Sequence, residues 1–314
     1  MIIAAALFVV VSLRSNHDGR RRAQALLERI SDGVLAADRR SAAAELRDLV
    51  LESRAAQAAV GIIGLPALTE VLREERDDVE LTHGCLEVLV NALTAGGASE
   101  PSARDDDAGV NGDGLDADGL DGGGVAVGPS AVGAANADAL AANPAHLELL
   151  LSLLDESDFY VRYHTVQLLT ALSATNAHQL REAIMSNPMG VGRLMDMMLE
   201  REVIRNETLL LLISLTKGSE DLRKIVAFEG AFERCFNIIR EEGAADGGII
   251  VQDCLELCNN LLRGSPSNQS FFRESSFLHQ LPAMVSLKVH APSKGGPPLN
   301  SNALHRDGRT SEPF

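Results

Sequence analysis

Pairs of leucines recur along the chain at helical spacing. Each pair is separated by four residues, one turn of an α-helix, within an apolar stretch. The four pairs are Leu89 with Leu93, Leu168 with Leu172, Leu211 with Leu215 and Leu257 with Leu261. The last three begin 43 residues (168 to 211) and 46 residues (211 to 257) apart. A period in the forties with several short helices per unit is typical of armadillo and HEAT repeats. The sequence therefore predicts an all-α solenoid.

Polar and small residues recur at fixed places around these pairs. Arg162 and Arg205 each stand six residues before the first leucine of their pair, and a glycine follows the pair at Gly96, Gly218 and Gly264. Glycine is the favoured residue just past a helix end. Because such units bury their apolar faces only against neighbouring units, the array presents a long surface that suits the binding of other macromolecules. The pattern indicates a binding scaffold.

The helical pattern forms two blocks separated by an acidic segment. Helices are expected over 23–54, 65–76 and 81–93, then over 147–154, 159–174, 177–186, 189–200, 203–217, 219–227, 231–242, 249–263 and 268–287. We assign armadillo-like repeats to residues 23–97 and 144–288. Residues 98–143 carry nine acids and one base among glycines and alanines. Without an apolar face to offset the entropy of ordering, this segment is predicted to be a disordered acidic loop, and the Pro/Gly-rich residues 289–314 a disordered tail.

The N-terminal segment, residues 1–22, has a character of its own. Residues 1–13 are almost wholly apolar, and the basic run Arg20, Arg21 and Arg22 follows. The apolar run is too short for an ordinary transmembrane helix of about 20 residues. It lacks the basic start and the small-residue cleavage site of a secretory signal. A weak signal-anchor, an interfacial segment and an incorrect start of the reading frame are the alternatives, and the last two are favoured over secretion.

Composition narrows the class of protein. The net charge is −16, and half of it falls within the acidic loop. The remaining chain is only mildly acidic, so a basic field for nucleic acid is not expected. The four cysteines show neither a CxxC pair nor the spacing of a disulfide framework. Cys254 and Cys258 lie four apart on one expected helix, where buried thiols are favoured over metal ligands and suit a reducing cytosol.

No constellation of residues indicates catalysis. The eight histidines are scattered without an HExxH or another paired-ligand spacing, and neither GxSxG nor GxxxxGK[ST] occurs. The acidic loop fails as a calcium site, because Leu120 and Asp121 stand where a ligand and the required glycine belong. We therefore expect no enzyme activity, no cofactor and no metal.

Five residues are candidates for contacts with a protein partner. Asn91 and Asn259 occupy the centre of matching Leu-x-Asn-x-Leu segments, and Asn260 adjoins. In armadillo repeats, asparagines on the last helix of a unit bind a partner's main chain, although a bond to a neighbouring loop is the alternative. Arg162 and Arg205 recur at another equivalent position. They are placed to clamp acidic groups of a partner or to pair with acids of the same chain.

The segments between the leucine pairs carry a family resemblance. The chain resembles the globular head of the general vesicular transport factor family over roughly residues 25–95 and 145–285. The matching motifs include 158–162 (DFYVR), 186–196 (SNPMGVGRLMD), 201–206 (REVIRN), 224–229 (KIVAFE) and 267–269 (SNQ) with the Phe271–Phe272 pair. Two unrelated leucine-rich solenoids would not share these loop sequences.

The resemblance implies a cytoplasmic vesicle tether that is peripheral on the Golgi membrane. It implies Rab-family small GTPases, golgins and SNARE proteins as partners. Family members form homodimers through a coiled coil, whereas no heptad pattern and no capping helix follow residue 288 here, so the head alone is expected. The alternative is an armadillo-type adaptor or transport receptor for another protein. The absence of tryptophan argues against that alternative.

Overall fold

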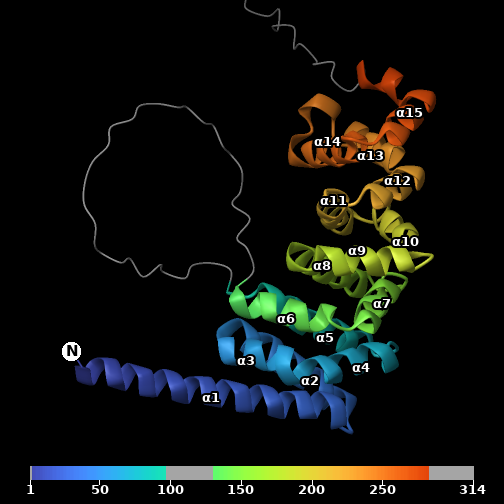
Figure 1. The fold of residues 1–314 in the computed structure, drawn as a ribbon. Helices are drawn as coiled ribbons and strands as arrows, with labels where there is room; N and C mark the ends of the chain where they lie inside the picture. The colour runs from blue at the N-terminus through green and yellow to red at the C-terminus, as the bar shows by residue number, and fades with distance from the viewer. Residues whose placement is uncertain (1, 97–129, 283–314) are drawn as a thin grey trace, which may run out of the picture.

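The computed structural model describes residues 2–96 and 130–282, and every regular element within those ranges is helical (Figure 1). The α-helices are α1 (Ile2–Asp32), α2 (Ala36–Glu52), α3 (Arg54–Ala59), α4 (Leu65–Glu74), α5 (Val79–Thr94), α6 (Ala131–Ala141), α7 (Pro144–Leu153), α8 (Phe159–Thr175), α9 (Ala177–Ser186), α10 (Gly190–Met197), α11 (Glu202–Thr216), α12 (Glu220–Phe228), α13 (Ala231–Glu241), α14 (Gly248–Leu262) and α15 (Pro266–Glu274). Three short turns complete the set: η1 (Val60–Gly64), η2 (Ala244–Asp246) and η3 (Phe277–Gln280). The all-α prediction is confirmed.

The helices stack as units of two or three. Helices α1 and α2 form the first unit, and the second to fifth units are α3–α5, with the π-helical turn η1 between α3 and α4, then α6–α8, α9–α11 and α12–α14. The last helix of each unit packs on the last helix of the next, so that α2, α5, α8, α11 and α14 form one continuous row (Figure 1). We call these five the ladder helices. Their stacking is the arrangement expected of an armadillo-like solenoid.

The repeated leucine pairs form the core of the stack. Each of these eight leucines is at most 2% exposed. They belong to one hydrophobic cluster that runs from α1 to α15. Because every unit contributes its apolar face to its neighbours, stability comes from unit-to-unit contacts rather than from any single helix.

Side chains of the connections set where the helices begin. The Asp158 carboxylate accepts hydrogen bonds from the amides of Tyr160 and Val161, which caps α8. Helices α5 and α14 are followed by Gly96 and Gly264, both with positive φ, a conformation that glycine adopts without steric cost. The glycines that recur after the leucine pairs therefore have a local role in two of the three copies.

The prediction of disorder throughout 98–143 is wrong for its last part. Residues 131–141 form α6, the first helix of the third unit, and residues 97–129 lie outside the described residues. Its buried face holds one large apolar side chain, Leu140, and otherwise small residues such as Ala137, with Gly133 against the end of α5. Asn136 is 4% exposed and donates to the carbonyl oxygens of Gln57 and Ala92. A face with one leucine among small residues carries little hydrophobic signal, which is why the leucine pattern did not reveal this helix.

The structure also changes the predicted ends of the array. Helix α1 runs from Ile2 to Asp32 and so crosses the expected boundary at residue 22. The helix expected over 268–287 is divided into α15 and η3 by Ser276, which has a positive φ. The predicted tail, 289–314, lies outside the described residues.

One helical run, Arg54–Glu74, is long and apolar enough to cross a membrane by length and composition. Within the fold, 56% of its apolar window is buried. Its buried residues include Val60, Leu68 and Leu72 in the shared core. Packing between α1 and α5 therefore accounts for its hydrophobicity.

Candidate protein-binding surface

The structure places all five candidate residues on ladder helices. Asn91 lies on α5, Arg162 on α8, Arg205 on α11, and Asn259 and Asn260 on α14. The sequence pattern thus located the row correctly. The side chains differ in what they contact, and these contacts divide the candidates into two groups.

Arg162 and Arg205 are engaged within the chain. The Arg162 guanidinium donates to the Glu156 carbonyl at 2.6 Å and pairs with Glu200 at 3.2 Å. Arg205, whose side chain is 11% exposed, pairs with Glu242 at 2.6 Å. Each acid lies in the connection that leads to the next ladder helix. The structure therefore gives both arginines the intramolecular role that the sequence left open.

The same pairing occurs in the first units. Arg40 on α2 contacts Asp78, the residue that caps α5, at 2.8 Å. Asp78 in turn accepts from the Leu81 amide, so one carboxylate joins a helix start to the previous ladder helix. Such charge-assisted hydrogen bonds fix geometry as well as supplying energy. The recurring arginines therefore act as clamps between successive units.

Replacement of Arg205 by methionine is expected to destabilise the chain by about 1–3 kcal/mol, because the Glu242 carboxylate loses its hydrogen-bonded partner in a half-buried position. Chemical denaturation measures the change. Lys217→Met is the matched control, since its pair with Glu256 is much more exposed, 59% for the lysine side chain, and is expected to contribute less than about 1 kcal/mol. Equal effects of the two substitutions would contradict the clamp.

The asparagines differ from one another in exposure. Asn260 is half-buried, and its amide donates to the Ile213 carbonyl on α11 at 3.3 Å. Asn259 is exposed, whereas Asn91 is half-buried. In α5, Asn91 lies three residues after Val88, the first of two adjacent buried residues. In α14, Asn260 lies three residues after Leu257, which is likewise followed by a buried residue. By packing, Asn91 therefore corresponds to Asn260, one residue away from the match that the sequence indicated.

A polar hollow lies beside Asn259 between the last two ladder helices. Its volume is about 420 Å³, and it is lined by Thr216, Lys217, Arg223, Glu256, Asn259, Asn260 and Arg263. The lining has three cationic side chains and one carboxylate, so its net charge is positive although the whole chain is acidic. Amide donors beside cations are suited to acidic or carbonyl groups of a protein partner.

A second hollow, of about 360 Å³, lies on the ladder between α5, α8 and α11. It is lined by Val90, Leu93, Thr94, Gln167, Thr170, Ala171, Ala174 and Glu207. Burial raises the pKa of Glu207, and a hydrogen bond with Thr170 opposes that shift. A carboxylate that is partly desolvated in this way favours a partner that supplies a donor or a positive charge.

Glu207→Gln is expected to stabilise the chain at neutral pH. The pKa of Glu207 is higher in the folded state than its ordinary value of 4.5, so the unfolded chain loses this proton first as the pH rises. Above pH 4.5 the ionisation of Glu207 therefore lowers the free energy of unfolding. Glutamine removes the charge and retains an oxygen for Thr170. Denaturation midpoints across an acidic-to-neutral pH series test this. The gain should disappear as the pH falls below the ordinary value, and a gain independent of pH would contradict the assignment.

The cysteines are thiols of the core. All four are free and buried, which includes Cys254 and Cys258, the two for which the sequence favoured buried thiols. Burial raises the pKa of Cys85 to about 12. The pKa of Cys235 is also raised, by hydrogen bonds with Cys254 and Cys258 and by burial. Cys85 and Cys235 therefore remain protonated near neutral pH and are poor nucleophiles.

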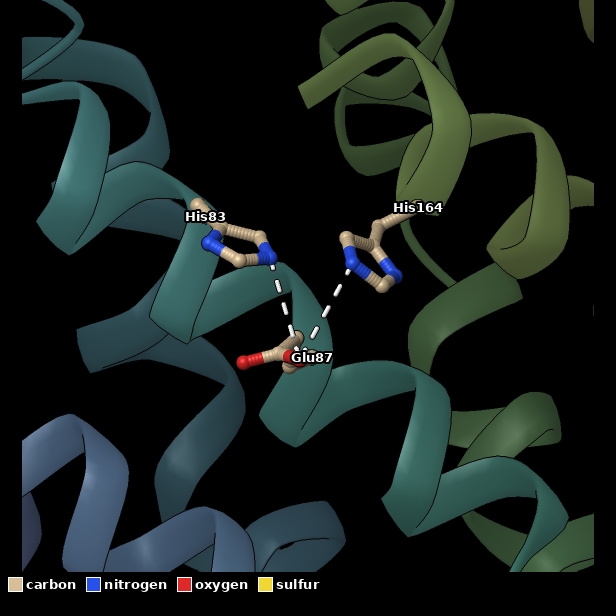
Figure 2. A group of neighbouring side chains, drawn as sticks. All are labelled: His83, Glu87 and His164. Carbon is tan, nitrogen blue, oxygen red and sulfur yellow. Dashed lines mark ion pairs between the residues drawn. The ribbon is translucent and has the colours of Figure 1, made fainter. Parts of the chain in front are cut away.

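The structure brings together one group of titratable residues that the sequence analysis treated singly. His83 and Glu87 on α5 face His164 on α8 (Figure 2). His83 and Glu87 are four residues apart, a spacing that places them on one helix face. His164 is 81 residues further along the chain than His83, so only the packing of α5 on α8 makes it a neighbour.

The described fold is that of an armadillo-like α-solenoid. A designed armadillo repeat protein, solved in complex with a (KR)4 peptide, superposes on the chain with a TM-score of 0.57 at 13% identity. This similarity concerns the fold alone. No protein-family model matches the chain. More specific similarity comes from individual proteins.

The chain is 46% identical over 233 residues to Golgin candidate 6 of Arabidopsis thaliana, covering 74% of this chain and 23% of that protein. It is 37% identical over 266 residues to general vesicular transport factor p115 of Homo sapiens, covering 84% and 25%. A crystal structure of Uso1-1 superposes with a TM-score of 0.71 at 28% identity, covering 87% and 41%. The chain belongs to the general vesicular transport factor family and spans about a quarter of the length of these two relatives.

Proposed function

We propose that this chain is the non-catalytic, protein-binding head of a vesicle tether. The observation that supports the proposal is similarity to vesicular transport factors over 84% of the chain, at 37% identity to p115. The solenoid offers a long side-chain surface and shares its stacking with Uso1-1. A scaffold of this kind works by holding partners rather than by chemistry.

The proposed partners are Rab-family small GTPases, golgins and SNARE proteins, and the proposed location is the cytoplasmic side of the Golgi, as a peripheral protein. Support for the partner-binding region comes from the ladder. The hollow between α11 and α14 presents Lys217, Arg263 and the exposed Asn259, none of them in the core. We assign partner contact to this hollow. The arginine clamps and Asn260 keep the ladder helices in register.

Retention of Rab GTPases on the immobilised chain tests the proposal. A panel of purified Rabs, each loaded with a non-hydrolysable GTP analogue or with GDP, is passed over the protein. At least one is expected to be retained in the GTP-analogue form only. The variant Lys217→Glu/Arg263→Glu should lose this retention. Lys224→Glu, a single charge reversal on α12, which is not a ladder helix, should keep it.

Two outcomes would contradict the proposal. If no Rab bound in either nucleotide form, recognition of Rab GTPases by this chain would be excluded. Retention that survives Lys217→Glu/Arg263→Glu would place the contact outside the hollow. Circular dichroism of each variant shows whether the helices are intact, so a loss of binding through unfolding is recognised.

A further inference from the structure

The group formed by His83, Glu87 and His164 has the geometry of a cation site. The ligand atoms of the three residues all lie within 4.8 Å of one another. The Glu87 Oε1 atom is 3.7 Å from His83 Nε2 and 3.9 Å from His164 Nε2 (Figure 2). These separations exceed the length of a hydrogen bond, so the carboxylate faces both imidazoles without forming a hydrogen bond to either.

Hydrogen bonds around His164 determine which ring nitrogen has a lone pair. The Gln167 amide nitrogen donates to the Tyr163 hydroxyl at 2.8 Å, which directs the Gln167 carbonyl oxygen to His164 Nδ1 at 2.9 Å. A carbonyl oxygen only accepts, so Nδ1 carries the proton and Nε2, the nitrogen facing Glu87, does not. An outer hydrogen bond of this kind is how proteins orient a histidine that binds a metal.

The other two residues of the group, His83 and Glu87, are each held by one contact besides those within the group or by stacking inside it. His83 Nε2 is buried and has no hydrogen-bond partner among the described residues, an arrangement that needs an explanation in a native fold. Its ring stacks on that of His164, with ring centroids 4.8 Å apart. Arg47 contacts Glu87 Oε2 at 3.2 Å, which fixes the carboxylate and leaves Oε1 to face both imidazoles.

We propose that His83, Glu87 and His164 form a Zn²⁺ site that joins the second and third repeat units. Two imidazole nitrogens and one carboxylate oxygen are a recognised zinc donor set, and water supplies a fourth ligand. The hard cations Mg²⁺ and Ca²⁺ prefer all-oxygen sites and are excluded by the two imidazoles. Zinc–nitrogen bonds of about 2.0–2.1 Å require the ligands to move closer together, and side-chain rotation of His83, which has no hydrogen bond at Nε2, would bring its ring toward Glu87. The ligand side chains are 13–30% exposed, so the ion reaches the site from solvent.

Neutral imidazole is the form that binds metal. The hydrogen bond between His164 Nδ1 and the Gln167 carbonyl oxygen holds the ring in the tautomer that leaves a lone pair on Nε2, facing Glu87. The groups facing it are His83 and Glu87 from α5 and Gln167 from its own helix. Because the ligands come from α5 and α8, zinc would stabilise the contact between two units that are separated in sequence by residues 97–129.

Titration of the full chain with Zn²⁺, followed by calorimetry and by thermal unfolding, tests the proposal. One equivalent is expected to bind saturably and to raise the unfolding temperature. His83→Gln, Glu87→Gln and His164→Gln should each weaken binding by at least about tenfold. Gln167→Leu leaves all three ligands in place and removes the hydrogen bonds to His164 Nδ1 and to the Tyr163 hydroxyl, and it should weaken binding by about 10–100-fold.

The control is His178→Gln. His178 and Glu182 on α9 have the same four-residue spacing and a 3.5 Å contact, but they are exposed and belong to no three-ligand group among the described residues. This variant should bind like the unsubstituted chain. No saturable binding by the unsubstituted chain, or binding that persists in both His83→Gln and His164→Gln, would overturn the site. Co²⁺ substitution gives an independent readout, because its visible absorption reports the coordination directly.

Discussion

Phe232→Ala is expected to destabilise the C-terminal units by about 3–5 kcal/mol. Phe232 on α13 is fully buried and lies at the centre of an aromatic cluster. Its ring centroid is 4.9 Å from that of Phe272 on α15 and 5.7 Å from that of Phe277 in η3. Truncation leaves a cavity where three elements meet, and rigid neighbours cannot collapse to fill it.

The effect should be local, because each unit of a solenoid contacts only its neighbours. Hydrogen exchange should accelerate in α13–α15 and remain slow in α2–α5. Phe228→Ala is the matched control: Phe228 lies on α12 and is 81% exposed, so its loss should change stability little. Equal destabilisation by the two substitutions, or uniform loss of protection along the whole array, would contradict this packing.

Gly133→Ala is expected to destabilise the third unit by about 1–3 kcal/mol, although alanine is the better helix former. A Cβ at this position of α6 would overlap the Leu93 carbonyl oxygen at the end of α5. Backbone at a helix end cannot move aside as a flexible side chain does. The helix α6 would therefore be displaced from α5, and the Asn136 hydrogen bonds to Gln57 and Ala92 would be strained.

Gly192→Ala provides the control of opposite sign. This glycine is in α10, and a Cβ there would meet nothing within 4 Å. Alanine should stabilise the helix by about 0.5–1 kcal/mol. Urea denaturation of both variants measures the difference. If Gly133→Ala were neutral or stabilising, α6 would not pack on α5 as described, and the disorder predicted from the sequence would be the better description of that segment.

The leucine pairs predicted most of the fold because large apolar side chains at helical spacing are an unambiguous signal. That signal located the ladder helices α5, α8, α11 and α14 to within one or two residues of their ends. It missed α6, whose buried face has a single large apolar side chain, Leu140, beside the small residues Gly133 and Ala137 and the amide of Asn136. Close packing of small residues depends on shape, which hydrophobic periodicity does not report.

The candidate surface was predicted less completely, since recurrence does not reveal what a side chain contacts. Arg162 and Arg205 stood out, but their pairing was left open. The acids lie 38 and 37 residues after them, at Glu200 and Glu242, and the separation of Arg40 from Asp78 is also 38. That second recurrence would have identified the clamps. By contrast, no local signal joins His83 to His164, because the contact depends on how α8 stacks on α5.

Display of the chain on the surface of mitochondria tests the central claim, that this solenoid head captures vesicle-transport partners through its ladder. The full chain, fused to a mitochondrial outer-membrane anchor, is expected to recruit GTP-bound Rab and vesicle markers to mitochondria in living cells. Lys217→Glu/Arg263→Glu should abolish that recruitment, and Lys224→Glu should preserve it. Mitochondria that carry the folded, displayed chain yet gather neither marker would contradict the account.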